Sequence, residues 1–199
     1  INKAGLIETV GSGEPRIDFS NDAKGALLLE PSRTNLITQS ESFGNWAGVF
    51  TAVNLNQTIS PSGIINAAKL TDTSDSSTHR IQLGNTTSSS GDFSYSIFLK
   101  KGTLTSVALS VYSGGNAADS KFDLESGTIT STTNGTAEIQ NYNNDWYRCI
   151  VKGSLLSSST TTYIYLKEKA SYSGNGDYLY AWGAQLEQGS YATSYIPTQ

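Results

Sequence analysis

The chain is short of the residues that build covalent and metal-based scaffolds. Its 199 residues include one cysteine, one histidine and no methionine. A single cysteine cannot form an internal disulfide bond, and one cysteine with one histidine supplies too few ligands for a zinc site. Because methionine is absent even at position 1, we expect residue 1 to be an internal boundary, with the chain a C-terminal module of a longer polypeptide.

Charge and long apolar runs are also scarce. Charged residues make up 15% of the chain, and the formal net charge is -4. The densest basic points are Lys100-Lys101 and the pair Lys167 and Lys169. Binding a phosphate backbone requires a basic patch, so we expect no nucleic-acid partner. No stretch approaches the roughly 18 apolar residues of a membrane span, so no membrane insertion is expected either.

The residues that are abundant favour strands. Tyr, Phe and Trp reach 10% of the chain and are set among Val, Ile and Thr, which is typical of half-buried strands. Short runs of this kind alternate with polar turns, as in a β-sandwich or a barrel. The predicted strands are 66–70, 79–83, 93–100, 106–112, 121–124, 128–131, 136–142, 146–155, 161–167 and 177–186.

The length favours one well-buried core, and therefore one main domain. Residues 1–25 alternate weakly and are interrupted by Gly and Pro, so they are interpreted as an extended arm or linker before a domain of residues 26–199. Between two predicted strands, Asn134-Gly135 is typical of a two-residue turn and predicts a β-hairpin there.

Candidate catalytic groups are few. His79 could act as a catalytic base only beside a nucleophile, and the sequence contains no Gly-x-Ser-x-Gly nucleophile elbow. A structural or ligand-contact role is therefore favoured for His79. Asp123 and Glu125 form the only tight carboxylate pair on one side of a strand, and the Ser-Gly that follows indicates a solvated strand end. We therefore predict no catalytic residue and no cofactor. A structural calcium ion stays open as a minority alternative, because loops 72–75 and 174–177 are rich in oxygen ligands.

Strand alternation predicts one face that mixes aromatic, basic and polar side chains. In 146–152, Trp146, Arg148 and Lys152 share one side, and in 93–100, Phe98 and Lys100 face away from the apolar set. In the last strand, alternation places Tyr180, Trp182, Ala184 and Leu186 in the core and Gln185 outside. Such a face suits sugars, because rings stack on C–H groups while polar groups bind hydroxyls. The predicted ligand-binding residues are Phe98, Lys100, Trp146, Arg148, Lys152 and Gln185. For Trp146, burial in the core is an equally weighted alternative.

Two end motifs carry a resemblance to a known family. They are LLLEPSRTNLI at 27–37 and WGAQLEQGSYATSYIPT at 182–198. Together with SYSIFLK at 94–100, FDLESG at 122–127 and DWYRC at 145–149, they resemble a jelly-roll, carbohydrate-binding-module-like domain of bacteriophage tail fibres and other virion proteins.

The resemblance implies an all-β, antiparallel β-sandwich of jelly-roll type whose first and last strands meet. It also implies that Arg33 and Asn35 bond backbone groups where the two end motifs cross. By the same resemblance the protein is expected to be a non-catalytic module of a virion, to recognise a host-surface polysaccharide and to contact other virion chains, with a homotrimer in the intact protein. The alternatives are a virion assembly or decoration domain that binds no sugar and, less favoured, a glycosidase or polysaccharide lyase domain.

Overall fold

The computed structural model describes residues 1–11, 13–20, 22–86 and 90–198. It is an all-β, antiparallel sandwich of jelly-roll type, as expected. Among the described residues, the one helical element is the short 3-10 turn η1 (Phe43–Asn45). In its described part, the chain contains no helix with the length and apolar character that crossing a membrane requires.

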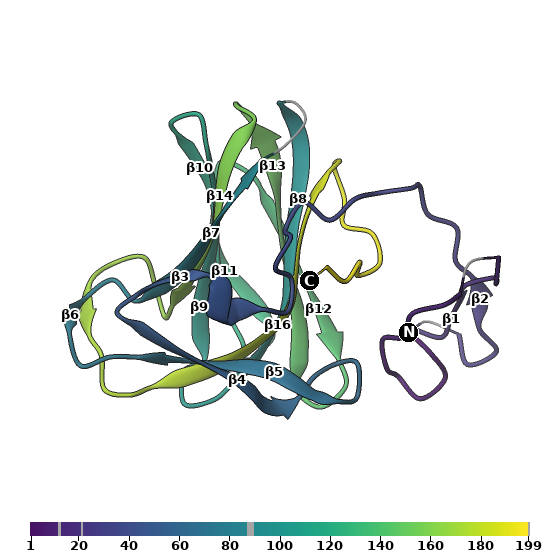
Figure 1. Cartoon of the computed structure of the whole chain (residues 1–199), viewed down its shortest axis with the longest axis horizontal. Helices are drawn as coiled ribbons and strands as arrows, with labels where there is room; N and C mark the ends of the chain where they lie inside the picture. The colour runs from purple at the N-terminus through teal and green to yellow at the C-terminus, as the bar shows by residue number, and fades with distance from the viewer. Residues whose placement is uncertain (12, 21, 87–89, 199) are drawn as a thin grey trace.

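Two six-stranded sheets form the layers of the sandwich, which fills the left of Figure 1. Sheet I contains, in spatial order, β11 (Thr128–Thr133), β10 (Asn116–Asp123), β9 (Ser106–Ser113), β14 (Ser159–Leu166), β7 (Arg80–Thr86) and β3 (Ala47–Val49). Sheet II contains β12 (Thr136–Tyr142), β13 (Trp146–Leu155), β8 (Gly91–Lys101), β16 (Tyr178–Gln188), β5 (Ile65–Asp72) and β4 (Thr51–Ile59).

Each of the ten predicted strands overlaps a strand of the structure. The long strand β4 has no predicted counterpart. It lies at the edge of sheet II, most of its residues are exposed, and its register with β5 shifts between Asn54 and Thr58. Only Val53 of this strand packs against the core, so β4 presents too short an apolar alternation to be recognised in the sequence.

The predicted hairpin at Asn134-Gly135 is wrong. The two strands that flank it, β11 and β12, belong to different sheets, so this turn carries the chain from sheet I to sheet II. Asn134 does take a positive φ of 54°, and a Cβ on Gly135 would lie 2.3 Å from the Lys152 carbonyl oxygen. Glycine is therefore required at 135 because the chain passes close to the neighbouring strand β13 as it enters sheet II, and not because a two-residue hairpin joins β11 to β12.

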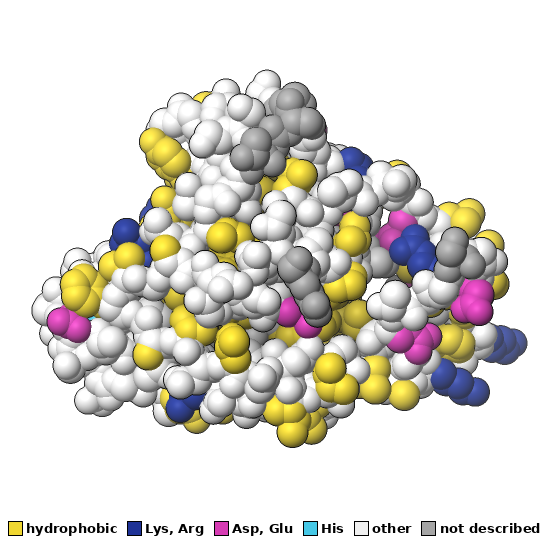
Figure 2. Space-filling view, viewed as in Figure 1, with side chains coloured by type: hydrophobic (Ala, Val, Ile, Leu, Met, Phe, Trp, Pro, Cys, Tyr) yellow, Lys and Arg dark blue, Asp and Glu magenta, His cyan; other side chains and the backbone are white. Residues whose placement is uncertain are grey.

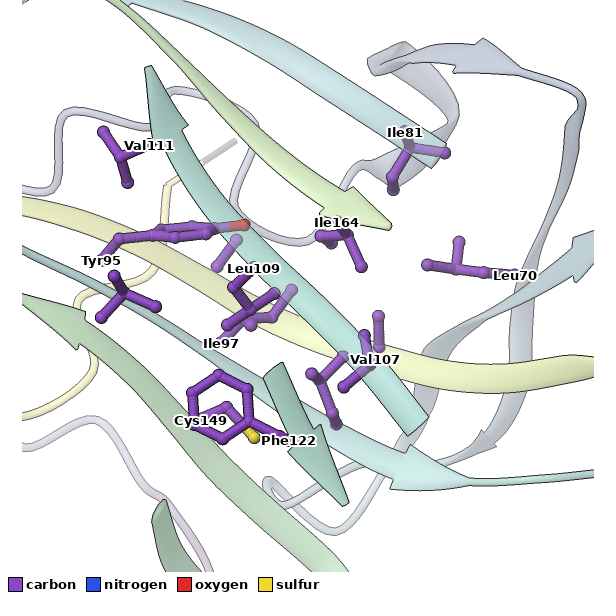
Figure 3. Packing of buried hydrophobic residues seen from close by; sticks show 14 of the residues in the cluster. Leu70, Ile81, Tyr95, Ile97, Val107, Leu109, Val111, Phe122, Cys149 and Ile164 are labelled. Carbon is purple, nitrogen blue, oxygen red and sulfur yellow. The ribbon is translucent and has the colours of Figure 1, made fainter. Parts of the chain in front are cut away.

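The core fills the space between the sheets. Alternate residues of the central strands point inward, among them Tyr95, Ile97, Leu109 and Ile164 (Figure 3). Cys149 is buried in the same cluster, and burial raises the pKa of its thiol. A buried thiol held in its neutral form is a poor nucleophile, so Cys149 acts as a packing residue.

The described part of residues 1–28, called the N-terminal segment below, forms a small lobe at the right of Figure 1. Its two short strands, β1 (Ile17–Asp18) and β2 (Ala26–Leu27), pair across the predicted boundary between residues 25 and 26. The N-terminal ammonium of Ile1 forms an ion pair with Asp18 at 2.7 Å. The yellow C-terminal residues 189–198, called the tail, lie between this lobe and the sandwich. One further short ladder joins β6 (Ser76–Ser77) to β15 (Tyr172–Ser173).

Candidate functional site

The six predicted ligand-binding residues lie on one surface, the outer face of sheet II. Arg148 is the cross-strand neighbour of Phe98, and Trp146 is the neighbour of Lys100. Lys152 lies opposite Ser94, and Gln185 lies opposite Ser96. Directly opposed residues of antiparallel strands point to the same side of the sheet, so the strands bring the six side chains together on one face.

One part of the predicted alternation is wrong. In β16, Tyr180 and Trp182 lie on the outer face, whereas Ala181 is buried in the core between the sheets. The register of β16 with β8 shifts between Trp182 and Gln185, where Gly183 has a φ of +63°. This bulge adds a residue and reverses the inward and outward positions, so Ala184 still points into the core and Gln185 still points out.

The outer face of sheet II is not an open groove. Phe98, Trp146 and Gln185 are at most 1% exposed, and Arg148 is 4% exposed. The Trp146 indole nitrogen donates a hydrogen bond to the Ile59 carbonyl at 3.1 Å. A ring this enclosed cannot stack on a ligand, so Trp146 is a packing residue, which was the equally weighted alternative.

The remaining predicted residues contact other parts of the protein. Lys100 Nζ donates to the Asn144 carbonyl at 2.8 Å, and Lys152 lies 3.4 Å from the Glu138 carboxylate. Gln185 donates to the Ser194 carbonyl at 3.2 Å and accepts from the Ile196 amide at 2.6 Å. Gln185 therefore ties the tail to sheet II.

The two end motifs meet on this face, as the resemblance implied. Asn35 Nδ2 donates to the carbonyls of Ala184 at 3.1 Å and Ile196 at 2.9 Å, while its oxygen accepts from the Leu186 amide at 3.1 Å. Arg33 donates to the Gln188 carbonyl. The expected role of Arg33 and Asn35 in bonding backbone groups at the crossing is confirmed.

A cavity of about 570 Å³ lies between the outer face of sheet II, the N-terminal segment and the tail. Tyr142, Arg148 and Trp182 line it from the sheet, and Tyr195 lines it from the tail. On the opposite side Ile7 packs against the cluster of Phe98, Trp146 and Trp182. The amide of Ile7 is bonded to the Pro61 carbonyl at 2.9 Å, which fixes the N-terminal segment over the sheet.

Two carboxylates join the walls of this cavity. Glu30 accepts from the Ser194 amide at 2.9 Å and forms an ion pair with Arg16 at 3.1 Å. Glu41 accepts from the Tyr195 hydroxyl and from Asn66 Nδ2, each at 2.9 Å. Charged side chains of both signs gather on the lobe beside the cavity, whereas most of the sandwich surface in this view is uncharged (Figure 2).

Three polar atoms of the cavity lining have no hydrogen-bond partner among the described residues. They are Arg148 Nε, Trp182 Nε1 and Asn66 Oδ1. An unsatisfied buried polar group costs roughly 1–3 kcal/mol, so two donors and one acceptor are held here at a cost to stability. Burial lowers the pKa of Arg148, opposed by Tyr142 and by Glu187. Burial raises the pKa of Tyr142, and Arg148 partly offsets that effect.

The candidate catalytic groups have structural contacts. His79 is fully buried, with Nε2 3.1 Å from the Thr73 carbonyl and its ring 4.5 Å from that of Tyr172. Asp123 accepts from the amide of Glu125 at 2.8 Å, and Glu125 forms an ion pair with Lys101 at 2.6 Å. His79 is thus a buried residue with a backbone contact, and Asp123 and Glu125 lie at a solvated strand end.

The two loops considered for calcium lie together. Asp72 Oδ1 accepts from the amides of Asn175 at 3.0 Å and Asp177 at 2.8 Å, and Oδ2 accepts from the Tyr172 hydroxyl at 3.1 Å. This carboxylate thus already orders the second loop through protein donors. Within the described ranges, no group of three or more His, Cys, Asp or Glu side chains is placed to hold a metal ion.

Sequence reasoning missed most of the cavity lining. Of the six predicted residues only Arg148 lines the cavity, and Trp182 was assigned to the core because the bulge at Gly183 is invisible to strict alternation. Glu30, Glu41 and Tyr195 lie in or next to the end motifs, so their proximity was the available signal for a site there.

Comparison with known proteins supports the fold. No protein-family model and no curated protein matches the sequence. A solved carbohydrate-binding module, TmCBM61 in complex with β-1,4-galactotriose, superposes with a TM-score of 0.51 at 12% identity, covering 78% of this chain and 99% of the module. The chain shares its sandwich fold with that carbohydrate-binding module.

Two further structures are similar at lower scores. One is a putative sugar-binding protein from Bacteroides thetaiotaomicron, with a TM-score of 0.46 and 11% identity over 78% of this chain and 100% of that one. The other is the enzymatically active domain of tailspike protein 4 of bacteriophage CBA120, with a TM-score of 0.41 and 9% identity over 76% of this chain and 21% of that one.

Proposed function

We propose that this chain is a non-catalytic carbohydrate-binding module of a phage virion protein of tail-fibre type, which recognises a host-surface polysaccharide. The observation that carries the sugar-binding part is the cavity on the outer face of sheet II, in a fold shared with a carbohydrate-binding module. Its lining combines aromatic rings with convergent donors and acceptors, which is the composition that sugar recognition requires.

The virion part of the proposal rests on the resemblance of the end motifs at 27–37 and 182–198. These motifs are structural, because Asn35 and Gln185 use their side chains to join the chain ends. On the basis of that resemblance, we place the protein on the extracellular phage particle, in contact with other virion chains and as a homotrimer in the intact fibre. Several weak sugar sites displayed together would gain avidity of about a hundredfold or more.

A glycan array with the folded chain tests the sugar-binding function, with a blocked variant to locate the site. Thr9 lines the cavity, is exposed and belongs to the N-terminal segment, so Thr9→Trp should fill the entrance without removing a core contact. We expect at least a tenfold loss of affinity for the glycans that the wild type binds. The matched control, Ala52→Trp, places the same side chain on the exposed edge strand β4 of sheet II, outside the cavity lining, and should bind normally.

Failure of the folded wild type to bind any glycan would overturn sugar binding and favour a second candidate, an assembly domain. A specific observation supports that alternative. Leu27, Leu29, Ile64 and Ile65 are between 58% and 83% exposed, and exposed apolar side chains are typical of protein contacts. Sedimentation of the intact fibre protein with Ile65→Lys would then reveal a lost contact. A reducing-end assay, expected to be negative, tests the glycosidase and lyase alternative.

A further inference from the structure

The outer face of sheet I carries two adjacent tyrosines with stacked rings at its centre. In β14, Ile164 and Leu166 point into the core, so Tyr163 and Tyr165 point away from it. Both tyrosines are partly exposed. Their rings are stacked, with centroids 5.5 Å apart and an interplanar angle of 21°.

The neighbours of this pair are small on one side. Tyr163 lies opposite Ser110 of β9, and Tyr165 lies opposite Ala108. Neither neighbour rises high enough to cover a tyrosine ring. Tyr112, 44% exposed, continues the aromatic surface one outward position along β9. Three tyrosines thus form a surface, called the tyrosine platform below, that consists of Tyr112, Tyr163 and Tyr165.

A guanidinium lies beside the platform. Arg80 is the cross-strand neighbour of Tyr165 in β7, and its guanidinium carbon is 5.8 Å and 6.0 Å from the ring centroids of Tyr165 and Tyr163. Arg80 Nε donates to Gln82 Oε1 at 3.0 Å, and Nη1 donates to Thr78 Oγ1 at 2.9 Å. These two bonds hold the group in place, and they involve neutral partners.

Arg80 has no carboxylate partner among the described residues, whereas two lysines of this face are paired. Lys169, whose Nζ lies 5.5 Å from the Tyr165 ring centroid, is paired with Asp119 at 2.8 Å. Lys121 lies 3.8 Å from Glu168. No ion pair between described residues involves Arg80, so its positive charge is available to an anionic ligand.

We propose that the outer face of sheet I is a second sugar-binding site, and that its ligand is an acidic polysaccharide whose repeating unit carries a carboxylate. A sugar ring packs its C–H face against the exposed surface of the stacked Tyr163 and Tyr165 rings, and the sugar carboxylate accepts hydrogen bonds from Arg80. A guanidinium held by two neutral acceptors is suited to a carboxylate, because its planar fork bonds both oxygens. A neutral sugar would leave that charge without a counter-ion.

This site lies on the opposite side of the sandwich from the cavity, because the outer faces of the two sheets point in opposite directions. It rests on the proposed function only in taking a sugar as ligand. One polysaccharide-binding module with two sites can engage two segments of the same polymer, and the second contact then forms at a high effective concentration.

The test is isothermal titration calorimetry with trisaccharides of galacturonate, mannuronate and glucuronate, each compared with its methyl ester. The ester keeps the ring and removes the charge. We expect at least one acid to bind about tenfold or more tightly than its ester. Arg80→Gln should abolish that preference, and Tyr165→Ala should weaken binding of the acid about tenfold, the value of a stacked ring. Higher salt should weaken wild-type binding.

The matched controls are Tyr191→Ala and Lys24→Gln, which remove an exposed ring and an exposed cation from other parts of the surface. Both should bind like the wild type. The proposal is overturned if none of the three acids binds, if acids and esters bind equally, or if Arg80→Gln binds normally. Neutral glycans that bind the wild type and are lost in Thr9→Trp would still support the cavity, so the two proposals fail separately.

Discussion

The two outer faces of this sandwich both carry aromatic side chains, but one face is covered by other parts of the chain and the other is exposed to solvent. Sheet II carries Phe98, Trp146 and Trp182 on its outer face and buries them beneath the N-terminal segment and the tail. Sheet I carries the tyrosine platform and leaves it in contact with solvent. Purely apolar rings and indoles gain most from burial, whereas a tyrosine has a hydroxyl that water can satisfy. The difference teaches that an aromatic face becomes a packing surface where the N-terminal segment and the tail cover it, and stays available for binding where they do not.

The largest expected effect is on the covered face. Trp146→Ala should lower the free energy of unfolding by about 3–5 kcal/mol, because it removes a ring that is 1% exposed and its bond to Ile59. The control on the open face, Tyr112→Ala, should cost less than about 1 kcal/mol. Urea denaturation measures both. Equal costs would mean that the two faces are not packed differently.

The next effect concerns the crossing of the end motifs. Asn35→Ala should destabilise the domain by about 2–4 kcal/mol, because it leaves the buried carbonyl of Ala184 and the amide of Leu186 without their partner. Asn45→Ala is the matched control, since Asn45 bonds Gln39 on the surface and its loss should stay within about 0.5 kcal/mol. Thermal unfolding of both variants measures the two effects. A loss of stability in Asn35→Ala as small as that in Asn45→Ala would contradict a structural role for the motif.

A smaller effect is expected at the contact that holds the N-terminal segment over sheet II. Ile7→Ala should cost about 1–2 kcal/mol, because Ile7 is only partly buried against the aromatic cluster. Limited proteolysis should cut within residues 1–28 faster in this variant, with the sandwich left intact. Ile129→Ala, which truncates an exposed isoleucine of β11, should leave the cleavage rate unchanged. An unchanged rate in Ile7→Ala would place the anchor of the segment elsewhere.

The smallest effect at neutral pH is expected in the core. The Tyr95 hydroxyl is buried and has no partner among the described residues, so Tyr95→Phe should be neutral or stabilise by up to about 1 kcal/mol. A destabilised variant in urea at pH 7 would indicate a partner for this hydroxyl.

Tyr95 also predicts how stability responds to alkali. Burial raises the pKa of Tyr95 above its value in the unfolded chain, about 10. Above that pH the unfolded state loses a proton that the folded state keeps, so stability falls by about 1.4 kcal/mol per pH unit for this group. Tyr95→Phe should therefore remove about 1 kcal/mol of the loss of unfolding free energy between pH 10 and 11, where the unfolded tyrosine is still titrating. An unaltered slope would contradict the burial of Tyr95.

Much of the fold follows from local chemistry that the sequence displays. The strands β12 and β13 have the predicted bounds, because in a half-buried strand inward apolar residues alternate with outward polar ones along the sequence. The closure of the sandwich by the end motifs was implied by the family resemblance of those motifs, and the bonds of Arg33 and Asn35 agree with it. The edge strand β4 was not predictable in this way, because only Val53 of this strand packs against the core.

The candidate sites depended on longer-range relations. Alternation alone placed Arg148, Trp146 and Phe98 on one face, and it failed at Trp182 because a single bulge at Gly183 reverses the pattern. Which aromatic face is covered is not encoded in either sheet. It depends on where the N-terminal segment and the tail pack against the sandwich. The contacts that hold them there, such as Ile7 with Pro61 and Gln185 with Ile196, join segments far apart in the chain. The sequence therefore determined the strands and the side chains of each face, whereas burial and access were decided only when the ends folded over sheet II.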